Sequence, residues 1–268
     1  MLDVNSDPRA WSNYNVSSDV ADLAARSLVA PFPPTALMQR VSGLTDPRDF
    51  ASHGRDLFLA LNAASPKNLS EYRNILDFGV GSGRLARMFL GFKGSYTGAD
   101  IDHELVDWVG GALPWVTPLR TKERAALLCP DNSFDCVISV SVFTHMNEAD
   151  SEFYLRELHR VTKPGACLLL TVHGRRALTR AETEARIFEM LSIPEAGMKE
   201  AMRRMADPGF TFIIQPQGHL TTENYEYGIS FTDEGYIRSR WSKFFFVEKI
   251  VAGGIHDFQD IVVLRKQA

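Results

Sequence analysis

The fold of this chain is decided by one stretch of sequence, Ile75-Leu76-Asp77-Phe78-Gly79-Val80-Gly81-Ser82-Gly83-Arg84. An apolar run typical of a strand ends in three closely spaced glycines, and residues 85–90 then follow a helical pattern. Glycines let the backbone approach a ligand closely, and a helix N-terminus offers unpaired N–H groups and the positive end of the helix dipole. The stretch therefore predicts a strand, a tight turn and a helix, with a polar or anionic ligand at the turn.

Two ligand classes compete for such a turn, and the glycines alone do not separate them. A dinucleotide site has the pattern Gly-x-Gly-x-x-Gly; it fails when counted from Gly79, and it is met only formally when counted from Gly81. The acid inside the strand, Asp77, repels a pyrophosphate but accepts hydrogen bonds from an ammonium group. S-adenosylmethionine (SAM) carries an ammonium, a carboxylate and a sulfonium but no phosphate, so Asp77 favours SAM.

A second acid supports a nucleoside ligand. Asp100 ends the next predicted strand, 17 residues after Gly83. A carboxylate at that place accepts hydrogen bonds from both ribose hydroxyls of a bound nucleoside. The alternative is that Asp77 is a solvated turn acid and Asp100 only a helix cap.

Strand and helix patterns alternate on both sides of the glycine stretch. Predicted strands lie at residues 74–78, 96–100, 134–139, 167–172, 244–251 and 260–265. Helical patterns separate most of them, which predicts an α/β domain with a mostly parallel sheet and helices on both faces. Gly253-Gly254 separates the last two strands, so we expect these to pair antiparallel through a turn at the glycines.

The domain organisation follows from the places where this alternation stops. Residues 1–70 show helical spacing without strands, and we interpret them as a helical N-terminal appendage that acts as a lid. Residues 71–268 form the main domain. Within it, residues 175–230 interrupt the pattern after the strand at 167–172, with a helical stretch at 182–205 and an extra strand at 210–215. We expect this insertion to form a second part of the lid.

Composition excludes several classes of protein. The 268 residues are 45% hydrophobic and 23% charged, with a net charge of −4, which is typical of a globular domain and unlike a nucleic-acid-binding one. No run of about 18 apolar residues predicts a membrane span, and the polar N-terminus lacks a signal-peptide core. The three cysteines lack metal-ligand spacing, so we expect no metal and a cytoplasmic location. The oligomeric state stays open.

Four motifs in order resemble those of the class I SAM-dependent methyltransferases. Residues 76–84 look like the first motif of that family and residues 96–102 like the second. Residues 131–139, running on to His145, are similar to the fourth-strand motif, and residues 157–165 to the helix and turn before the fifth strand. The resemblance covers about residues 70 to 175 and, weakly, 230 to 268. It implies a Rossmann-like sheet of seven strands with the last one antiparallel.

The resemblance also implies a set of cofactor-binding residues. Asp77, Phe78, Gly79, Gly81 and Gly83 would surround the methionine part of SAM, Asp100 would bind the ribose, Ile101 would lie against the adenine, and Ser139 and Ser141 would lie near the methyl-donor end.

Two histidines follow predicted strands at the edge where open α/β sheets bind ligands. His145 follows the strand predicted at residues 134–139, and His173 follows the one at 167–172. An imidazole titrates near neutral pH, so either side chain is a candidate for taking the proton of an alcohol that attacks the methyl group. The alternatives are that both are hydrogen-bonded histidines of the rim, or that the reaction uses no base.

These observations predict a SAM-dependent methyltransferase acting on a small molecule, with oxygen of a sugar, glycan precursor or secondary metabolite as the acceptor. Two other functions stay open at this point. One is a SAM-binding protein without catalysis, and the other is a nicotinamide-dependent oxidoreductase.

Overall fold

A computed structural model describes residues 2–17, 28–205, 209–215 and 226–267. The strands are β1 (Asn74–Phe78), β2 (Ser95–Asp100), β3 (Val116–Arg120), β4 (Phe134–Ser139), β5 (Thr162–Val172), β6 (Phe210–Ile214), β7 (Gly228–Thr232), β8 (Phe246–Ile255) and β9 (Gln259–Arg265). The α-helices are α1 (Pro8–Ser17), α2 (Thr35–Ser42), α3 (Pro47–Ala64), α4 (His103–Ala112), α5 (Glu148–Val161), α6 (Arg175–Thr183), α7 (Ala185–Leu191), α8 (Glu195–Arg204) and α9 (Glu234–Arg240). Short 3₁₀ helices are η2 (Leu69–Glu71), η3 (Ala86–Phe89) and η4 (Trp241–Lys243).

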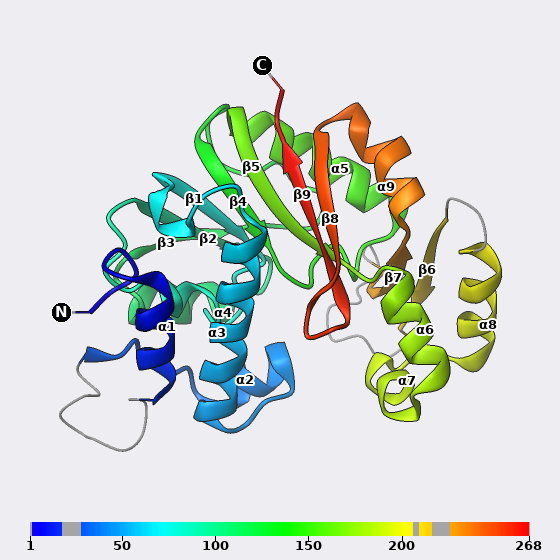
Figure 1. Cartoon of the computed structure of the whole chain (residues 1–268), viewed down its shortest axis with the longest axis horizontal. Coiled ribbons are helices and arrows are strands. Elements are labelled where there is room, and N and C mark those ends of the chain that lie inside the picture. Colours follow the sequence, from blue (N-terminus) through cyan, green and yellow to red (C-terminus); the bar gives the residue numbers. More distant parts are fainter. Residues whose placement is uncertain (1, 18–27, 206–208, 216–225, 268) are drawn as a thin grey trace. The chain divides into compact units, whose positions relative to one another are not determined.

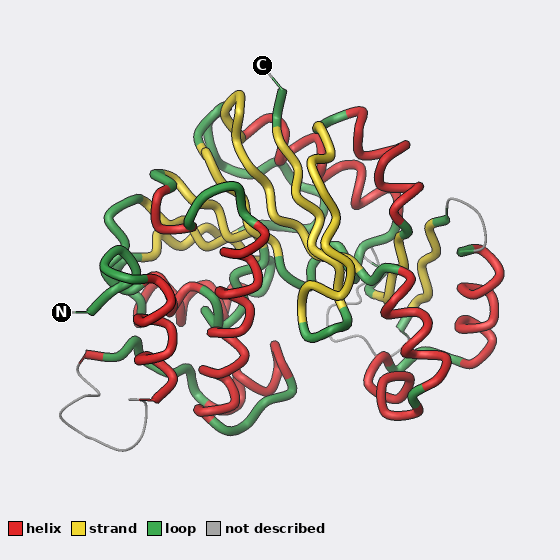
Figure 2. The backbone as a smooth tube through the Cα atoms, viewed as in Figure 1, coloured by secondary structure: helices red, strands yellow, loops and turns green. Residues whose placement is uncertain are grey.

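The main sheet has seven strands in the order β3-β2-β1-β4-β5-β9-β8, and β6 and β7 form a separate pair (Figure 1). Strands β1, β2, β3 and β4 pair in parallel, while β9 runs antiparallel to both β5 and β8. Helices flank the strands (Figure 2). This confirms the predicted Rossmann-like sheet with its last strand antiparallel. The chain forms two compact units, Met1–Ile138 and Ser139–Ala268, which are described separately.

The N-terminal part of the first unit is helical, as the spacing of its apolar residues predicts. Asp46 begins α3 by accepting hydrogen bonds from the backbone N–H groups of Arg48 and Asp49, and Pro47 is the first helical residue. The four apolar residues that recur at helical spacing, Phe50, Leu57, Phe58 and Leu61, are all buried. Helix α3 packs on α1, on α2 and on η3, so the N-terminal helices share one core with the glycine stretch.

The helix expected after the glycines is shorter than predicted. Residues 85–90 contain only the four-residue 3₁₀ helix η3. Side chains from elsewhere in the unit bind its carbonyl groups: the Trp115 indole N–H donates to Ala86 O (3.0 Å) and the Trp11 indole N–H donates to Met88 O (2.9 Å). These carbonyls lie at positions where a longer helix would use them internally. The prediction of a full helix with a dipole at the turn was therefore wrong.

In the second unit, β9 pairs with β5 on one side and with β8 on the other. The turn between β8 and β9 is not at Gly253-Gly254, which lie inside β8. It is at His256 and Asp257, both at positive φ (51° and 56°), and Phe258 N donates to Ile255 O across it (2.9 Å). Gly253 N instead donates to the Asp260 carboxylate (2.8 Å) at an irregularity in the ladder. The antiparallel pairing was predicted correctly, and the place of the turn was wrong.

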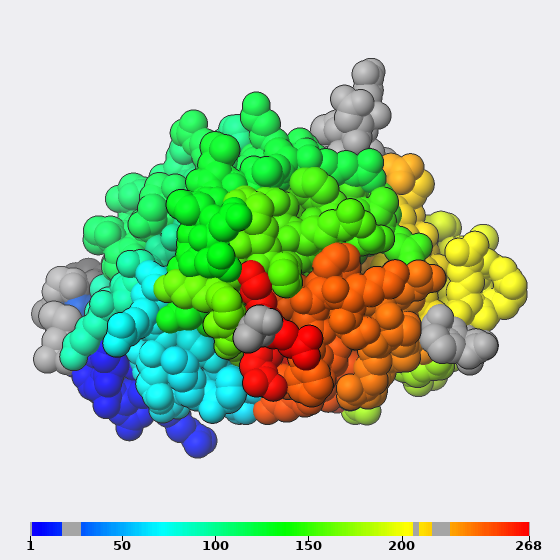
Figure 3. Space-filling view, turned by 90° about the horizontal axis from the view of Figure 1, so that it is seen from above, coloured from blue at the N-terminus to red at the C-terminus, as the bar shows by residue number. Residues whose placement is uncertain are grey.

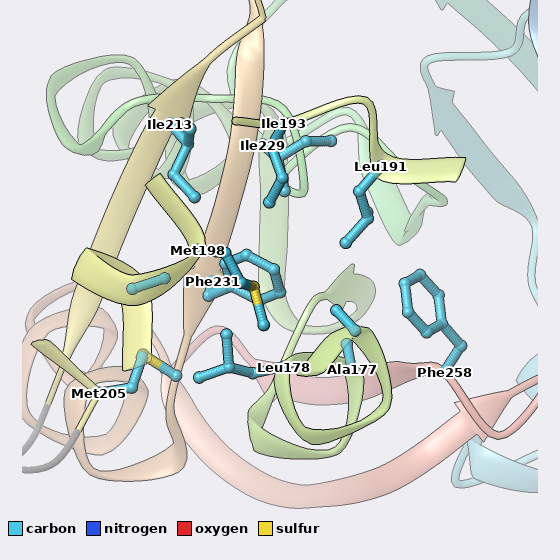
Figure 4. Close-up of a cluster of buried hydrophobic side chains, with 12 residues drawn as sticks. Ala177, Leu178, Leu191, Ile193, Met198, Met205, Ile213, Ile229, Phe231 and Phe258 are labelled. Carbon is cyan, nitrogen blue, oxygen red and sulfur yellow. The ribbon is translucent and has the colours of Figure 1, made fainter. Parts of the chain in front are cut away.

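The segment between β5 and α9 has its own small core (Figure 4). Helices α6 and α8 pack on the β6–β7 pair, and α6 also packs on β8 and β9. The side chains of this core are Ala177, Leu178, Ala181, Leu191, Ile193, Met198, Ala201, Met205, Ile213, Ile229, Phe231 and Phe258. The expected strand at 210–215 is β6, and its partner β7 was not expected. This segment and the residues of α9 and β8 reach the surface in the space-filling view, in yellow and orange (Figure 3).

Candidate active site

The glycine stretch of the first unit turns tightly between β1 and η3. Gly79, Gly81 and Gly83 all have positive φ (90°, 54° and 83°), a conformation that other L-residues adopt at a cost. At Gly83 a Cβ atom would also lie 2.8 Å from the Leu113 side chain. Glycine is therefore required here both for the backbone conformation and for close packing.

The N–H groups of this turn are mostly bound within the chain. Gly79 N and Val80 N both donate to Ala99 O (2.8 and 3.0 Å), and Gly81 N donates to Asp100 Oδ2 (2.8 Å). The turn folds back onto the end of β2, which continues the parallel pairing of β1 with β2. The sequence had suggested free N–H groups at the turn, and the structure differs from that expectation at these three residues.

Asp77 lies at 2% exposure in β1, and the Tyr96 hydroxyl of β2 donates to its Oδ2 atom (2.7 Å). Burial raises the pKa of Asp77 to about 7, although the Tyr96 hydrogen bond opposes this change and the nearby Asp100 charge adds to it. Burial and the Asp77 charge in turn raise the pKa of Tyr96. Asp77 is thus a buried carboxyl group that gains or loses a proton near neutral pH.

Two polar groups beside this turn can take a further partner: in the part of the chain that the structure describes, the Ser82 hydroxyl has none and the Asp77 carboxylate has one donor. The hydroxyl of Ser82, buried within the glycine stretch, has no hydrogen-bond partner there. Tyr96 is the one described residue that donates to the Asp77 carboxylate. A ligand with a cationic group and a carboxylate supplies partners for both, so these residues fit the amino-acid end of SAM.

Asp100 ends β2 with both carboxylate oxygens engaged by backbone N–H groups. Oδ2 accepts from Gly81 N, and Oδ1 accepts from Asp102 N (3.0 Å). Burial raises the pKa of Asp100, and these backbone hydrogen bonds oppose the change. Each oxygen keeps a lone pair for a further donor. Next to it, Ile101 is half-buried, and Phe78 at the end of β1 is buried.

In the second unit, Ser139 is fully buried and Ser141 is tied to two strands. Ser141 N donates to the Thr171 hydroxyl of β5 (2.8 Å), and the Gln259 amide of β9 donates to Ser141 Oγ (2.9 Å). Ser141 also has a positive φ of 58°, which a residue other than glycine adopts at a cost of about 1–3 kcal/mol. Its backbone is therefore held in place by the surrounding strands.

The two histidines of the second unit lie side by side. The ring centroids of His145 and His173 are 6.5 Å apart, edge to face. His145 Nδ1 contacts Gly228 O (2.8 Å), and His173 Nδ1 contacts Ser230 O (3.3 Å). Both carbonyls belong to β7, so one strand holds both imidazoles.

The two imidazoles differ in how deeply they are buried. His173 is 3% exposed, and burial lowers its pKa to about 3, with a further contribution from the neighbouring charge of His145. His145 is half-buried and stacks on the Tyr227 ring, with centroids 4.6 Å apart and an interplanar angle of 12°. His173 therefore stays neutral in the range where enzymes of ordinary pH optimum work.

Among the residues that the structure describes, every helix is too short or too polar to span a lipid bilayer. The same residues contain no group of three His, Cys, Asp or Glu side chains arranged to hold a metal ion.

Comparison with known proteins finds one matching family and several structures of similar fold. Residues 76–170 match the family described as a methyltransferase domain. The PH0226 protein from Pyrococcus horikoshii OT3 is similar in structure, with a TM-score of 0.57, 15% identity, and coverage of 80% of this chain and 91% of that one. A SAM-dependent methyltransferase from Aquifex aeolicus gives a TM-score of 0.51 with 20% identity, over 88% of this chain and 100% of that one.

A third similar structure holds the demethylated form of the cofactor. It is the 1,6-didemethyltoxoflavin-N1-methyltransferase of Burkholderia thailandensis with bound 1,6-didemethyltoxoflavin and S-adenosylhomocysteine. The TM-score is 0.54 with 16% identity, over 89% of this chain and 93% of that one. The sheet order, the glycine turn and the similar structures define a Rossmann-like methyltransferase fold. Residues 76–170 of this fold match a methyltransferase domain.

Several residues of the candidate site were not found from the sequence, among them Ser82 in the glycine turn and Gly228 in β7. Tyr96 binds Asp77, and Tyr227 and Ser230 contact the two histidines. The signal for Tyr96 was an aromatic hydroxyl in the strand next to the one that carries Asp77. Tyr227 and Ser230 carried no signal, since they lie more than 50 residues from the histidines along the chain.

Tyr96→Phe tests whether the Asp77 carboxylate is held for the cofactor. The variant removes the hydroxyl that donates to Oδ2, and one such hydrogen bond contributes about 1–1.5 kcal/mol. We expect SAM affinity to fall about five- to tenfold in isothermal titration calorimetry. Tyr72→Phe is the matched control, because it removes a contact with the Ser65 hydroxyl (3.0 Å) away from the turn. Equal affinities in the two variants would contradict the assignment.

Proposed function

We propose that this enzyme transfers the methyl group of SAM to a hydroxyl oxygen of a small molecule, with His145 as the proton acceptor. The observation that carries the proposal is the pair of adjacent imidazoles held by β7, of which only His145 is partly exposed. A sugar, a glycan precursor or a secondary metabolite offers such a hydroxyl. Location in the cytoplasm and the absence of nucleic-acid substrates stay predictions from the sequence.

The cofactor is assigned to the residues that the sequence pointed to. Asp77 pairs with the ammonium group of SAM, and the Ser82 hydroxyl, which the sequence did not single out, donates to its carboxylate. Asp100 accepts from the ribose hydroxyls, and Ile101 packs on the adenine. Gly79, Gly81 and Gly83 give the ligand access to the backbone, with Phe78 beneath them. Within the described residues, the Ser82 hydroxyl without a partner and the single donor at Asp77 support this assignment.

The reaction is an in-line displacement at the methyl carbon. SAM supplies a methyl group on a positively charged sulfur, which leaves with the electron pair of the broken carbon–sulfur bond. The acceptor oxygen forms the new bond to carbon and loses its proton to Nε2 of His145. Alignment of the acceptor contributes most to such a reaction, and a base adds about 10²–10⁴-fold. Ser139 and Ser141 are assigned to the methyl-donor end.

His173 was the second candidate for the base, and its burial argues against that role. A group with a pKa of about 3 is a weak proton acceptor at neutral pH. We propose instead that His173 serves as an uncharged neighbour of His145. Its lowered pKa keeps a second positive charge away from an imidazole that must accept a proton.

Two segments are proposed to close over the ligands. Within the first unit, α2 contacts the glycine turn: a Cβ atom at Gly81 would lie 2.9 Å from the Val41 side chain. Arg40 of the same helix forms ion pairs with Asp102 (3.0 Å) and Glu104 (2.7 Å), just after Asp100. These contacts support the interpretation of residues 1–70 as a lid. The insertion at residues 175–230 is proposed as the lid over the acceptor.

The proposal is tested by offering the purified chain SAM together with separate panels of sugars, phenols, aliphatic alcohols, amines and RNA. We expect S-adenosylhomocysteine and a methyl ether of one hydroxyl compound, both detected by mass spectrometry. Catalytic methylation of an amine or of RNA, with no turnover of any hydroxyl compound, would overturn the proposed acceptor class and leave the class of enzyme intact.

A further inference from the structure

Strand β7 contacts both histidines through its backbone. Gly228 O lies 2.8 Å from His145 Nδ1, and Ser230 O lies 3.3 Å from His173 Nδ1. A carbonyl oxygen has no proton to give, so in both contacts the ring nitrogen is the donor. In a neutral imidazole with Nδ1 protonated, the free lone pair is on Nε2. The contacts of β7 therefore select one tautomer of each histidine.

Ser230 fastens β7 to the segment that carries His145. It is fully buried, its hydroxyl donates to Phe143 O (2.7 Å), and its N–H donates to Thr144 O (2.8 Å). Thr232 N donates to His173 O (2.8 Å) two residues further along. The strand thus binds the backbone on both sides of the histidine pair, so the carbonyl positions are fixed relative to the rings.

Tyr227 fixes the plane of the His145 ring. The two rings are stacked at 4.6 Å and are tilted by only 12°. Burial raises the pKa of Tyr227 to about 12, so the stacked ring is neutral phenol at any ordinary pH. With its face covered by Tyr227 and its Nδ1 atom on Gly228 O, the His145 ring has little freedom to rotate.

The small core packs against one side of β7. Ile229 and Phe231 alternate with Gly228 and Ser230 and point into the cluster in Figure 4. At Gly228 itself, a Cβ atom would lie 2.3 Å from Ile213 O of β6, so the two strands approach as closely as glycine permits. One side of β7 is therefore anchored in an apolar core, while its carbonyls hold the imidazoles.

We propose that Tyr227, Gly228 and Ser230 are positioning residues for methyl transfer: they hold His145 as the Nδ1–H tautomer and aim its Nε2 lone pair at the acceptor proton. This inference rests on the proposed function, because it assigns a role to the insertion in the same proton transfer. The insertion then contributes chemistry, beyond any part it plays as a lid.

The tautomer is measured without any acceptor, which separates this inference from the proposed function. Long-range ¹H–¹⁵N correlation spectra of the ¹⁵N-histidine-labelled chain at pH 8 report which ring nitrogen carries the proton. The His145 signals are assigned by their loss in His145→Gln. We expect the Nδ1–H tautomer for His145 in the wild-type chain. The Nε2–H tautomer would overturn the inference, whatever the acceptor is.

Two variants connect the tautomer to turnover. Ser230→Ala removes the hydroxyl bond to Phe143 O, and Tyr227→Leu removes the stacked ring while leaving the buried core untouched. We expect mixed tautomers of His145 in both, and a fall in kcat of about tenfold to a hundredfold with the acceptor found in the screen. SAM affinity should stay within about twofold of wild type. A variant that lost kcat by unfolding would lose SAM affinity as well.

Thr162→Val is the matched control, because it deletes an equally buried hydroxyl that donates to a backbone carbonyl, Leu158 O at 2.7 Å. It should lower stability as Ser230→Ala does, without changing the His145 spectrum or kcat. If Ser230→Ala and Tyr227→Leu keep the wild-type tautomer and the wild-type kcat, β7 does not position the base and the inference is wrong.

Discussion

Asp77→Asn weakens SAM binding and at the same time stabilises the folded chain at pH 8. The amide keeps an oxygen for the Tyr96 hydroxyl but carries no charge to pair with an ammonium group. A hydrogen bond to a charged group contributes about 1.5–3 kcal/mol, so we expect SAM affinity to fall about 10- to 100-fold in calorimetry. The gain in stability has a separate cause, the burial of the carboxylate.

The sign of the stability change follows from proton binding. Burial raises the pKa of Asp77 from 3.8 to about 7, so between these values the folded chain holds a proton that the unfolded chain has released. The contribution of Asp77 to stability is therefore fully present below pH 3.8 and is lost as the pH rises through 7. One pKa unit corresponds to about 1.4 kcal/mol. At pH 8 we expect Asp77→Asn to gain about 2–4 kcal/mol in urea unfolding.

Asp135→Asn is the control for this variant. Asp135 accepts from the backbone N–H groups of Arg73 (3.1 Å) and Asn74 (2.8 Å) at the start of β1, away from the glycine turn. Losing that carboxylate should lower stability and leave SAM affinity unchanged. If Asp77→Asn binds SAM as tightly as the wild-type chain does, Asp77 does not contact the ammonium group and the cofactor assignment fails there.

The same buried carboxyl predicts that cofactor binding depends on pH. In the proposed site, SAM pairs with the ionised form of Asp77, so we expect binding below pH 7 to release the proton that the ligand-free chain holds. We expect the affinity of wild-type protein to rise by up to about tenfold per pH unit from pH 5 to pH 6. The slope should disappear in Asp77→Asn. A wild-type affinity that does not change over this range would show that Asp77 is already ionised without the ligand.

The elements predicted well from the sequence are those whose pattern is local. Strands β1, β4 and β9 contain short apolar runs, and helix α3 carries its own start signal at Asp46-Pro47. Strand β7 was missed because Gly228–Thr232 becomes a strand by pairing with β6. Helix η3 was overestimated because Trp11 and Trp115, distant along the chain, bind its carbonyls.

For the candidate site, the positions of the titratable residues could be predicted from the sequence, but their contacts could not. Asp77, Asp100, His145 and His173 were found because each lies in, ends or follows a predicted strand, a position that sequence shows directly. Their state was not predictable, since it depends on groups brought in by folding. The Tyr96 hydroxyl contacts Asp77 across two strands, and the carbonyls that orient the imidazoles come from 57 and 83 residues away. Sequence located the titratable groups, and only the packing shows which of them is buried and neutral.

His145→Gln should lower kcat by about 10²–10⁴-fold, the contribution of a general base to a reaction of this type. Glutamine keeps an N–H group to donate to Gly228 O, so the contact with β7 is retained while the basic lone pair is lost. SAM affinity should stay close to that of wild type. The measurement is kcat and KM for the acceptor identified in the screen, with S-adenosylhomocysteine release as the readout.

His159→Gln serves as the control for removing an imidazole elsewhere in the second unit, where that ring lies against Phe245 with centroids 5.5 Å apart. The pH profile then distinguishes the two candidate bases. Because the pKa of His173 is about 3, its protonation produces no change in rate between pH 5 and pH 8. Any decline in kcat/KM toward acid that belongs to the base must therefore come from His145, and must vanish in His145→Gln. If the decline persists there and vanishes in His173→Gln, the roles of the two histidines are reversed.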